Sequence, residues 1–377
     1  MEGARLTRRR DSTRTGSKPS SSSSNSQQKE ATRIKGEKGE ATESAILTGI
    51  QESNENEFSS SIVEQREGNP IEIDGPNRIW SVAFVADGEH IVRGSEDGTI
   101  RRWRMKDGKE VGAPMNAGFV VWDIAVSRDG RWIVSGTSGP QVTVWNAENH
   151  GLVTEFKGHD EAVYALAVSP DATTIATGSF DKTACIWSLS TGQRLLGPFK
   201  HDHYVVAVKF SPDGRLIATA TYQRNSVRIY DSRDGRLLVN FSIKVTWSNN
   251  QSLAWVSDSK QLFVLSHDGN IHHLDVLTQT TLVKWPIHSN NSPRCISLAS
   301  NGTFIAASDD SSVSFWDTTT HEQIGSVIHH PTSVDAMAIS ANYNLLTGGG
   351  TKIILRNLHD ILPSSYFDVV SVPVSNG

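Results

Sequence analysis

Seven stretches of the chain repeat one arrangement of apolar and polar positions. In the first stretch, Val82, Phe84 and Ile91 alternate with small or polar neighbours, which is the period-2 pattern of half-buried β-strands. Asp-Gly pairs such as Asp87-Gly88 interrupt the alternation and are typical of hairpin turns. The pattern predicts units of three short antiparallel strands, a, b and c. A further apolar stretch ahead of each following unit, such as residues 152–156, predicts an outer strand d.

The end of the third strand recurs at a regular spacing. Its positions are 103, 145, 187, 230, 274, 316 and 356, so the steps are 42, 42, 43, 44, 42 and 40 residues. Seven units at a period of about 40–45 residues resemble the WD-repeat (WD40) family over roughly residues 66–358. The resemblance implies an all-β fold, a seven-bladed β-propeller of four-stranded antiparallel blades. The residues at these positions are Trp103, Trp145, Trp187, Tyr230, Leu274, Trp316 and Arg356.

The ring must close, because an open ring leaves two unpaired strand edges. The seventh unit lacks its own fourth strand. Residues 71–73 lie where strand d precedes every other unit, and we expect them to cross to blade seven. The rival strand is residues 367–372. The habit of the family and the spacing both favour the N-terminal strand, which leaves residues 359–377 as a C-terminal flap or frayed end.

Residues 1–60 are Ser-rich and basic and have little to bury, so we expect a disordered tail ahead of a propeller at 61–358. Residues 1–38 hold ten Lys or Arg and four Asp or Glu, a net charge of +6. Because the whole chain carries −5, the remainder carries −11, and no direct binding of nucleic acid is expected. Arg8, Arg9 and Arg10 are read as part of a solvated tail, with a nuclear localisation signal as the alternative.

The location of the protein is predicted from what the sequence contains. Its two cysteines, Cys185 and Cys295, form no paired motif, and the N-terminus has no secretory apolar core. No stretch of 18 apolar residues indicates a membrane span. We therefore expect an intracellular protein, cytoplasmic and/or nuclear, that does not enter a membrane.

Many WD repeats carry a buried hydrogen-bond chain of His, Ser or Thr, Asp and Trp. The third unit matches it in full with His159, Thr177, Asp181 and Trp187, and the other units keep only parts. The set superficially resembles a catalytic His–Asp pair with a hydroxyl. A group buried between strands offers no nucleophile elbow or oxyanion site, so we expect a structural role.

Motifs of common enzymes are missing from the sequence. It contains no P-loop, GxSxG, HExxH or CxxC pattern. The adjacent pairs His272-His273 and His329-His330 would point to opposite faces of a strand, which is unsuited to one metal ion. We therefore expect no catalytic residue, no metal and no cofactor.

One repeat position predicts a binding site. In the family, the residue at the start of strand a often faces the top surface of the propeller and takes part in binding. Phe180, just ahead of Asp181, should lie close to this position. Aromatic residues at an exposed rim are typical of interface hot spots, although the rings could instead pack between blades near the channel. From unit one to unit seven the position holds Trp80, Trp122, Tyr164, Val206, Gln251, Arg294 and Asp335.

These observations predict a non-catalytic scaffold or adaptor. Its partner would be a peptide or protein segment with an apolar anchor, with Arg294 and Asp335 steering the polarity. Outside complexes the propeller should be monomeric. Two alternatives are a propeller-platform enzyme such as a hydrolase, and the sensor propeller of a relative of larger multidomain signalling proteins.

Overall fold

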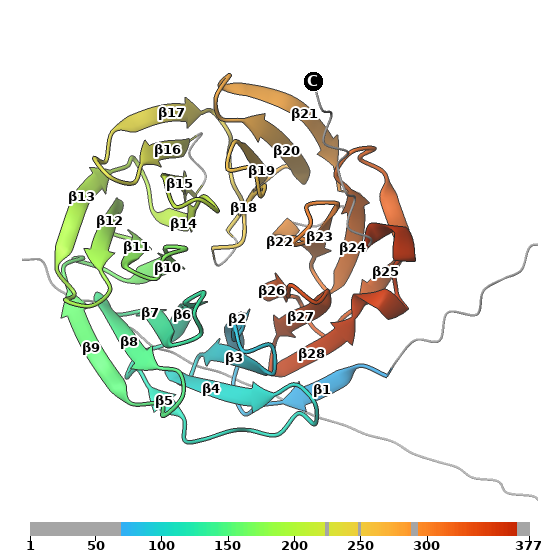
Figure 1. Ribbon diagram of the computed structural model, residues 1–377, viewed down its shortest axis with the longest axis horizontal. Coiled ribbons are helices and arrows are strands. Elements are labelled where there is room, and N and C mark those ends of the chain that lie inside the picture. The colour runs from blue at the N-terminus through green and yellow to red at the C-terminus, as the bar shows by residue number, and fades with distance from the viewer. Residues whose placement is uncertain (1–68, 223–225, 248–249, 288–292, 368–377) are drawn as a thin grey trace, which may run out of the picture. The chain divides into compact units, whose positions relative to one another are not determined.

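The computed structural model describes residues 69–222, 226–247, 250–287 and 293–367, and in them seven four-stranded antiparallel sheets form the blades of a ring (Figure 1). In each blade strand a lies innermost and strand d outermost. The predicted seven-bladed propeller is therefore confirmed. The chain divides into residues 1–62 and 63–377, and every described residue belongs to the second unit.

The strands follow each other in chain order within the first six blades. Blade one comprises β2 (Ile79–Phe84), β3 (His90–Ser95), β4 (Thr99–Arg104) and β5 (Met115–Asn116). Blade two comprises β6 (Val121–Val126), β7 (Trp132–Thr137), β8 (Gln141–Asn146) and β9 (Leu152–Lys157). Blade three comprises β10 (Val163–Val168), β11 (Thr174–Ser179), β12 (Thr183–Ser188) and β13 (Arg194–Lys200). Blade four comprises β14 (Val205–Phe210), β15 (Leu216–Thr221), β16 (Val227–Asp231) and β17 (Leu237–Phe241). Blade five comprises β18 (Leu253–Trp255), β19 (Gln261–Leu265), β20 (Asn270–Asp275) and β21 (Thr280–Pro286). Blade six comprises β22 (Pro293–Leu298), β23 (Phe304–Asp309), β24 (Ser312–Asp317) and β25 (Gln323–His329).

Blade seven joins the two ends of the ring. It comprises β26 (Ala336–Ile339), β27 (Asn344–Gly349), β28 (Lys352–Asn357) and β1 (Ile71–Asp74). Strand β1 pairs antiparallel with β28, with Ile71 opposite Leu355. The N-terminal closure predicted from the sequence is thus the one that the structure has. Beyond Phe367, the rival C-terminal strand lies outside the described residues.

A short C-terminal segment packs against blade six. It contains the 3₁₀ helices η1 (Leu358–Asp360) and η2 (Ser364–Tyr366). The carbonyl of Tyr366 accepts a hydrogen bond from Asn301 at 2.8 Å, and its hydroxyl donates to Asp317 at 2.9 Å. The described part of the C-terminal region is therefore a docked flap.

Neighbouring blades pack face to face. One apolar cluster combines Val134 and Val144 of blade two with Val163, Leu166 and Ile175 of blade three, all buried. The close approach requires glycine on strand b. A Cβ added at Gly178 would lie 2.7 Å from a methyl of Val205 in the next blade. Such packing holds each strand a at a fixed depth in the ring.

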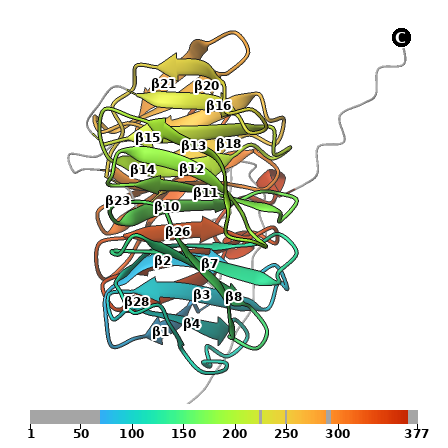
Figure 2. The ribbon, with the colours of Figure 1, turned by 90° about the vertical axis from the view of Figure 1, so that its left-hand side faces the viewer.

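The connections gather at the two faces of the disc. The strands run across its thickness, so the turns lie at opposite ends (Figure 2). We call the face with the d–a loops and b–c turns the top face. The face with the a–b and c–d turns is the bottom face.

Candidate protein-binding face

A β-bulge marks the start of strand a in most blades. In blades one, two, three, four and six, the pairing register between strands a and b shifts at the second residue of strand a. A bulge leaves this residue outside the regular ladder and re-aims its side chain. The bulged residues are Trp80, Trp122, Tyr164, Val206 and Arg294, so the aligned position coincides with a distinct backbone feature at the top end of strand a.

Aromatic rings in contact extend from this position across blades one to four. The ring centroids of Trp80 and Trp122 lie 4.9 Å apart, those of Trp122 and Tyr164 5.6 Å apart, and those of Tyr164 and Phe180 5.2 Å apart. These spacings fall in the range that aromatic pairs prefer. The predicted proximity of Phe180 to Tyr164 is confirmed. We call the full set the aromatic cluster: Trp80, Trp122, Tyr164, Phe180, Tyr204, Tyr222 and Trp247.

The members of the aromatic cluster differ in exposure. Trp247 is 37% exposed, whereas Tyr164 is fully buried. The two ring centroids lie 5.1 Å apart, and Trp247 also contacts Phe180 at 5.5 Å. The expectation of an exposed ring is therefore wrong for Tyr164, because a residue from another loop packs against it. Trp80, Trp122 and Phe180 are partly exposed.

Trp247, Tyr204 and Tyr222 were missed by the sequence analysis. None of them occupies the aligned position at the start of strand a. Trp247 belongs to the long connection between β17 and β18, residues 242–252. The largest step between units, 44 residues, includes this connection. That extra length was the signal in the sequence that could have indicated an unusual loop here.

The opposite part of the top face is held by ion pairs. The carboxylate of Asp335 lies 2.9 Å from the guanidinium of Arg78 and 2.7 Å from that of Arg294. The side chain of Asp335 is only 2% exposed, while those of the two arginines are about 40% exposed (42% and 38%). The Asp335 carboxylate is therefore buried and paired with two arginines, and its role in steering a partner stays a prediction. Arg78 also lies over the ring of Trp80, 4.2 Å from its centroid, and so joins this network to the aromatic cluster.

Asn250 and Gln251 tie the blades together across the channel. The Asn250 amide donates to the carboxylate of Asp123 in blade two at 2.8 Å, and its oxygen accepts from the backbone of Val208 in blade four at 2.7 Å. The side chain of Gln251 accepts from the backbone of Met337 in blade seven at 2.7 Å. The segment that follows Trp247 is thereby anchored to both sides of the ring.

Asp123 is the buried charge beneath this segment. It also accepts hydrogen bonds from Ser81 at 3.0 Å and from the backbone of Leu166 at 2.8 Å. Burial raises the pKa of Asp123 to about 6, although Lys209 and these hydrogen bonds act in the opposite direction. Asp123 and Lys209 line a channel cavity of about 490 Å³.

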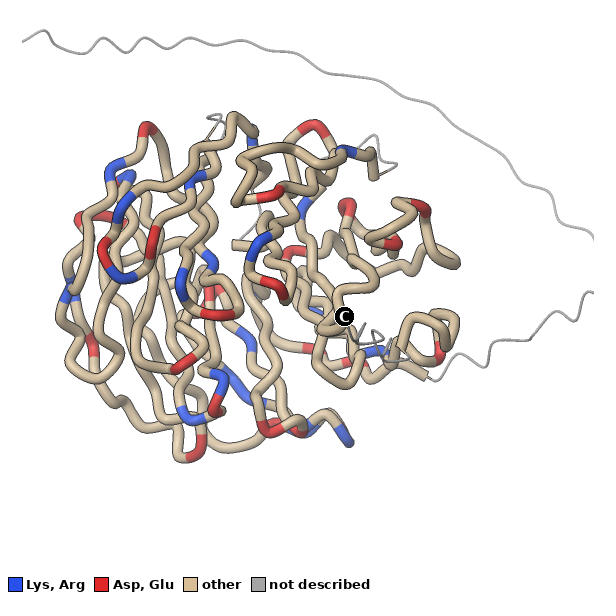
Figure 3. Tube along the Cα trace, turned by 45° about the horizontal axis from the view of Figure 1, so that its top comes forward, with Lys and Arg blue, Asp and Glu red and all other residues tan. Residues whose placement is uncertain are grey.

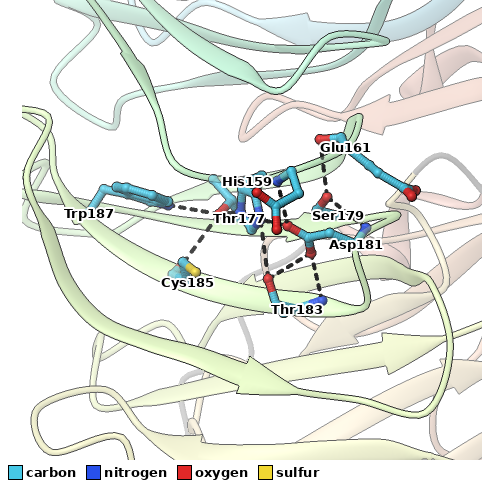
Figure 4. Close-up of polar contacts among 9 residues, drawn as sticks. His159, Glu161, Thr177, Ser179, Asp181, Thr183, Cys185 and Trp187 are labelled. Carbon is cyan, nitrogen blue, oxygen red and sulfur yellow. Dashed lines mark hydrogen bonds and ion pairs between the residues drawn. The ribbon is translucent and has the colours of Figure 1, made fainter.

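The predicted hydrogen-bond chain of blade three is confirmed (Figure 4). His159 contacts Asp181 through Nδ1 and Thr177 through Nε2, both at 2.7 Å. Trp187 donates its indole N–H to Thr177 Oγ1 at 2.8 Å. Burial alone would raise the pKa of Asp181, but the hydrogen bond and charge of His159, with further hydrogen bonds, lower it to about 2. Because Phe180 directly precedes Asp181, the chain fixes the turn that carries this ring.

Other blades replace parts of the chain. In blade two, Trp145 donates to Ser135 at 3.1 Å. In blade one, Arg93 stands at the hydroxyl position, is fully buried and lies 5.0 Å from the centroid of Trp103. His288 of blade six lies outside the described residues. The structure therefore shows a complete chain in blade three and substitutes in blades one and two.

The two cysteines are buried. Burial raises the pKa of the Cys185 thiol to about 11 and that of Cys295 to about 12, which disfavours the nucleophilic thiolate. Within the described ranges, no three His, Cys, Asp or Glu side chains are grouped so that they could hold a metal ion. The same ranges contain no helix with the length and apolar character needed to span a membrane.

Two family models match the chain. The model described as the IFT122 first beta-propeller matches residues 120–357, and the model described as the WD domain, G-beta repeat matches residues 69–104. No curated protein matches the chain. The two matched ranges together run from the strand that closes the ring to the end of β28.

Proposed function

The chain belongs to the IFT122 first beta-propeller family of WD-repeat proteins, and from this membership we propose that it is a non-catalytic scaffold that binds a peptide or protein segment on its top face. Propellers of these families generally serve as scaffolds for protein partners. The finer assignment is the binding surface. We place it on the exposed part of the aromatic cluster, centred on Trp247 and Phe180.

The observation that carries this proposal is the exposure of Trp247. A tryptophan that leaves 37% of its surface in water, although it packs against Tyr164 and Phe180, can still bury apolar area against a partner. Tryptophan and tyrosine dominate binding energy at protein interfaces, because they bury large areas and carry one polar group. Phe119, which is 48% exposed in a loop of the same face, would extend the surface toward blades one and two.

The buried residues of the site support this surface from below. Tyr164 packs under Trp247, and the His159–Asp181 hydrogen bond holds the turn with Phe180. Asn250 anchors the chain three residues after Trp247. A rigid aromatic surface loses little conformational entropy when a partner binds, which favours affinity.

Three further properties remain part of the proposal. We propose that the protein acts inside the cell, in the cytoplasm and/or the nucleus, on the ground that its cysteines form no disulfide framework. We propose that the propeller is monomeric outside complexes and does not bind nucleic acid directly. The expected disordered tail, residues 1–60, lies outside the described residues.

The test is a comparison of partner capture from the native cell. Full-length wild type would be run beside a Trp247→Ala/Phe180→Ala variant and a Leu277→Ala control. Leu277 is 68% exposed in a c–d turn of the bottom face, so its removal alters apolar surface at the opposite end. We expect specific partners with wild type and the control and their loss with the double variant. Partners that persist with the double variant would place the binding surface elsewhere.

A further inference from the structure

We infer that the segment bound by the aromatic cluster is cationic, a stretch of another protein in which Lys or Arg residues flank an apolar anchor. The inference rests on the proposed function, because it names the chemistry of the partner for the same surface. Three features of the top face carry it: exposed carboxylates without ion-pair partners, their attachment to the aromatic residues, and the affinity of the rings for cations.

Acidic side chains outnumber basic ones in the top loops of blades one to three. These loops, residues 75–78, 96–98, 117–120, 138–140, 158–162 and 180–182, hold five acidic and two basic residues. The acidic residues are Glu96, Asp97, Asp160, Glu161 and Asp181, and the basic residues are Arg78 and Lys182. Arg78 is already engaged by Asp335 and Trp80. Lys182 is the other basic residue, so the five acidic residues leave these loops with a net negative charge beside the rings.

Three of these carboxylates are free to meet a partner. Glu96, Asp160 and Glu161 are exposed, and none has a cationic group within ion-pair distance in the described part of the chain. Figure 4 shows the Glu161 side chain directed away from the hydrogen-bond chain of blade three. Some other exposed carboxylates are paired: on the bottom face Asp107 pairs with Arg104 and Asp129 with Arg131, each at 2.6 Å. Glu148, Asp234 and Glu322 of that face form no ion pair within the described ranges, but they lie far from the rings. Figure 3 marks the charged positions along the trace.

Hydrogen bonds of the backbone connect the loop segments that carry the free carboxylates to the residues of the aromatic surface. Glu96 donates its N–H to the carbonyl of Arg78, whose guanidinium lies over Trp80. Phe180 donates its N–H to the carbonyl of Ala162, the residue after Glu161. Asp160 donates its N–H to the carboxylate of Asp181, the residue after Phe180. The acids therefore border the rings.

Both parts of this surface favour cations. The face of an indole ring attracts ammonium and guanidinium groups, and Arg78 already occupies the face of Trp80 in this way. Exposed carboxylates raise the local concentration of a cationic partner and speed its association, an effect that salt screens. An anionic segment would meet repulsion at the same border, which disfavours acidic peptides.

The test uses the full-length protein and three fluorescein-labelled synthetic peptides. One peptide is a Gly/Ser chain in which lysines flank Leu-Trp-Leu. In the second, glutamates replace the lysines, and in the third, serines replace the apolar anchor. By fluorescence anisotropy, we expect the lysine peptide to bind about tenfold more tightly than the other two. Its affinity should fall at least severalfold when salt is raised from about 50 to about 300 mM.

A matched pair of variants assigns the effect to the top face. The Glu96→Gln/Asp160→Asn/Glu161→Gln variant should bind the lysine peptide about fivefold more weakly than wild type does. Its affinity for the glutamate peptide should not fall. The control, Glu148→Gln/Asp234→Asn/Glu322→Gln, removes three exposed charges from the bottom face and should leave affinity unchanged. Equal thermal unfolding of the variants confirms that they fold.

The outcomes separate the inference from the function on which it rests. The inference that the partner is cationic would be overturned if the glutamate peptide bound as tightly as the lysine peptide or more tightly. It would also be overturned if the top-face and bottom-face variants changed the affinity equally. Absence of binding by every peptide would overturn it too. The capture experiment with Trp247→Ala/Phe180→Ala decides the proposed function by itself, since it makes no assumption about the charge of the partner.

Discussion

The start of strand a carries aromatic rings in blades one to three and charged residues in blades six and seven. Trp80, Trp122 and Tyr164 form one row of tilted rings in contact, whereas Arg294 and Asp335 form an ion pair that also engages Arg78. The same aligned position thus serves two purposes. In the aromatic half it supports a surface with apolar area left in water, and in the charged half it holds a buried carboxylate between two partly exposed arginines. The repeat fixes where the side chain lies, and its tertiary contacts decide whether it is available to a partner.

The largest effect is expected from the charged half. Asp335→Ala would leave Arg78 and Arg294 close together without their shared carboxylate. Breaking a fully buried ion pair costs about 3 kcal/mol or more of unfolding free energy, and because the two arginines are about 40% exposed we expect a loss of about 2–3 kcal/mol here. Arg294→Ala is the control and should cost about 1 kcal/mol, because Asp335 keeps Arg78. Urea denaturation measures both, and a larger loss for Arg294→Ala would contradict the account.

The aromatic half should depend on the hydrogen-bond chain below Phe180. Asp181→Ala would leave the buried ring N–H of His159 without its acceptor, at a cost of about 2 kcal/mol. The control is Asp171→Ala, which removes comparable turn hydrogen bonds with Ser169 and Thr173 from an exposed bottom turn. We expect it to cost less than 1 kcal/mol, on the order of ordinary surface changes. Equal losses in chemical denaturation would show that blade three has no special anchoring role.

The last stability effect depends on pH and concerns the link between the two halves. Burial raises the pKa of Asp123 to about 6 in the folded protein, above that of the unfolded chain. The folded state therefore binds this proton more tightly, and the contribution of Asp123 to stability falls as pH rises from about 4 to about 6. Asp123→Asn removes the titration. The stability difference between wild type and Asp123→Asn should shift by about 2 kcal/mol between about pH 4.5 and pH 7.5, in favour of wild type at the lower pH. A constant difference would mean that Asp123 titrates normally.

Features that recur with the repeat were predictable from the sequence. The seven blades and the position at the start of strand a follow from a pattern that the sequence repeats. The hydrogen-bond chain from His159 to Trp187 follows from the resemblance to WD repeats, which blade three matches in full. The closure of the ring by residues 71–74 followed from the same spacing.

Features made by one loop were not predictable in this way. Trp247 and Asn250 lie in a connection that no other blade repeats, and Asn250 contacts Asp123 across 127 residues of sequence. The burial of Tyr164 depends on the contact with Trp247. The burial of Asp335 depends on the packing of blade seven against blades one and six. Local pattern shows which residues share a position, and the tertiary contacts decide how far each is exposed.

The most direct test of the central claim is to locate the bound partner on the propeller. A photo-reactive benzoylphenylalanine would be placed at Glu96 or Phe119 of the top face and, in parallel, at Glu148 or Leu277 of the bottom face, in otherwise unchanged full-length protein. Irradiation in the native cell, followed by mass spectrometry, identifies the crosslinked chains. The account predicts adducts with one set of partners from the top positions and their loss when Trp247→Ala is added. Adducts with those partners from the bottom positions alone would contradict it.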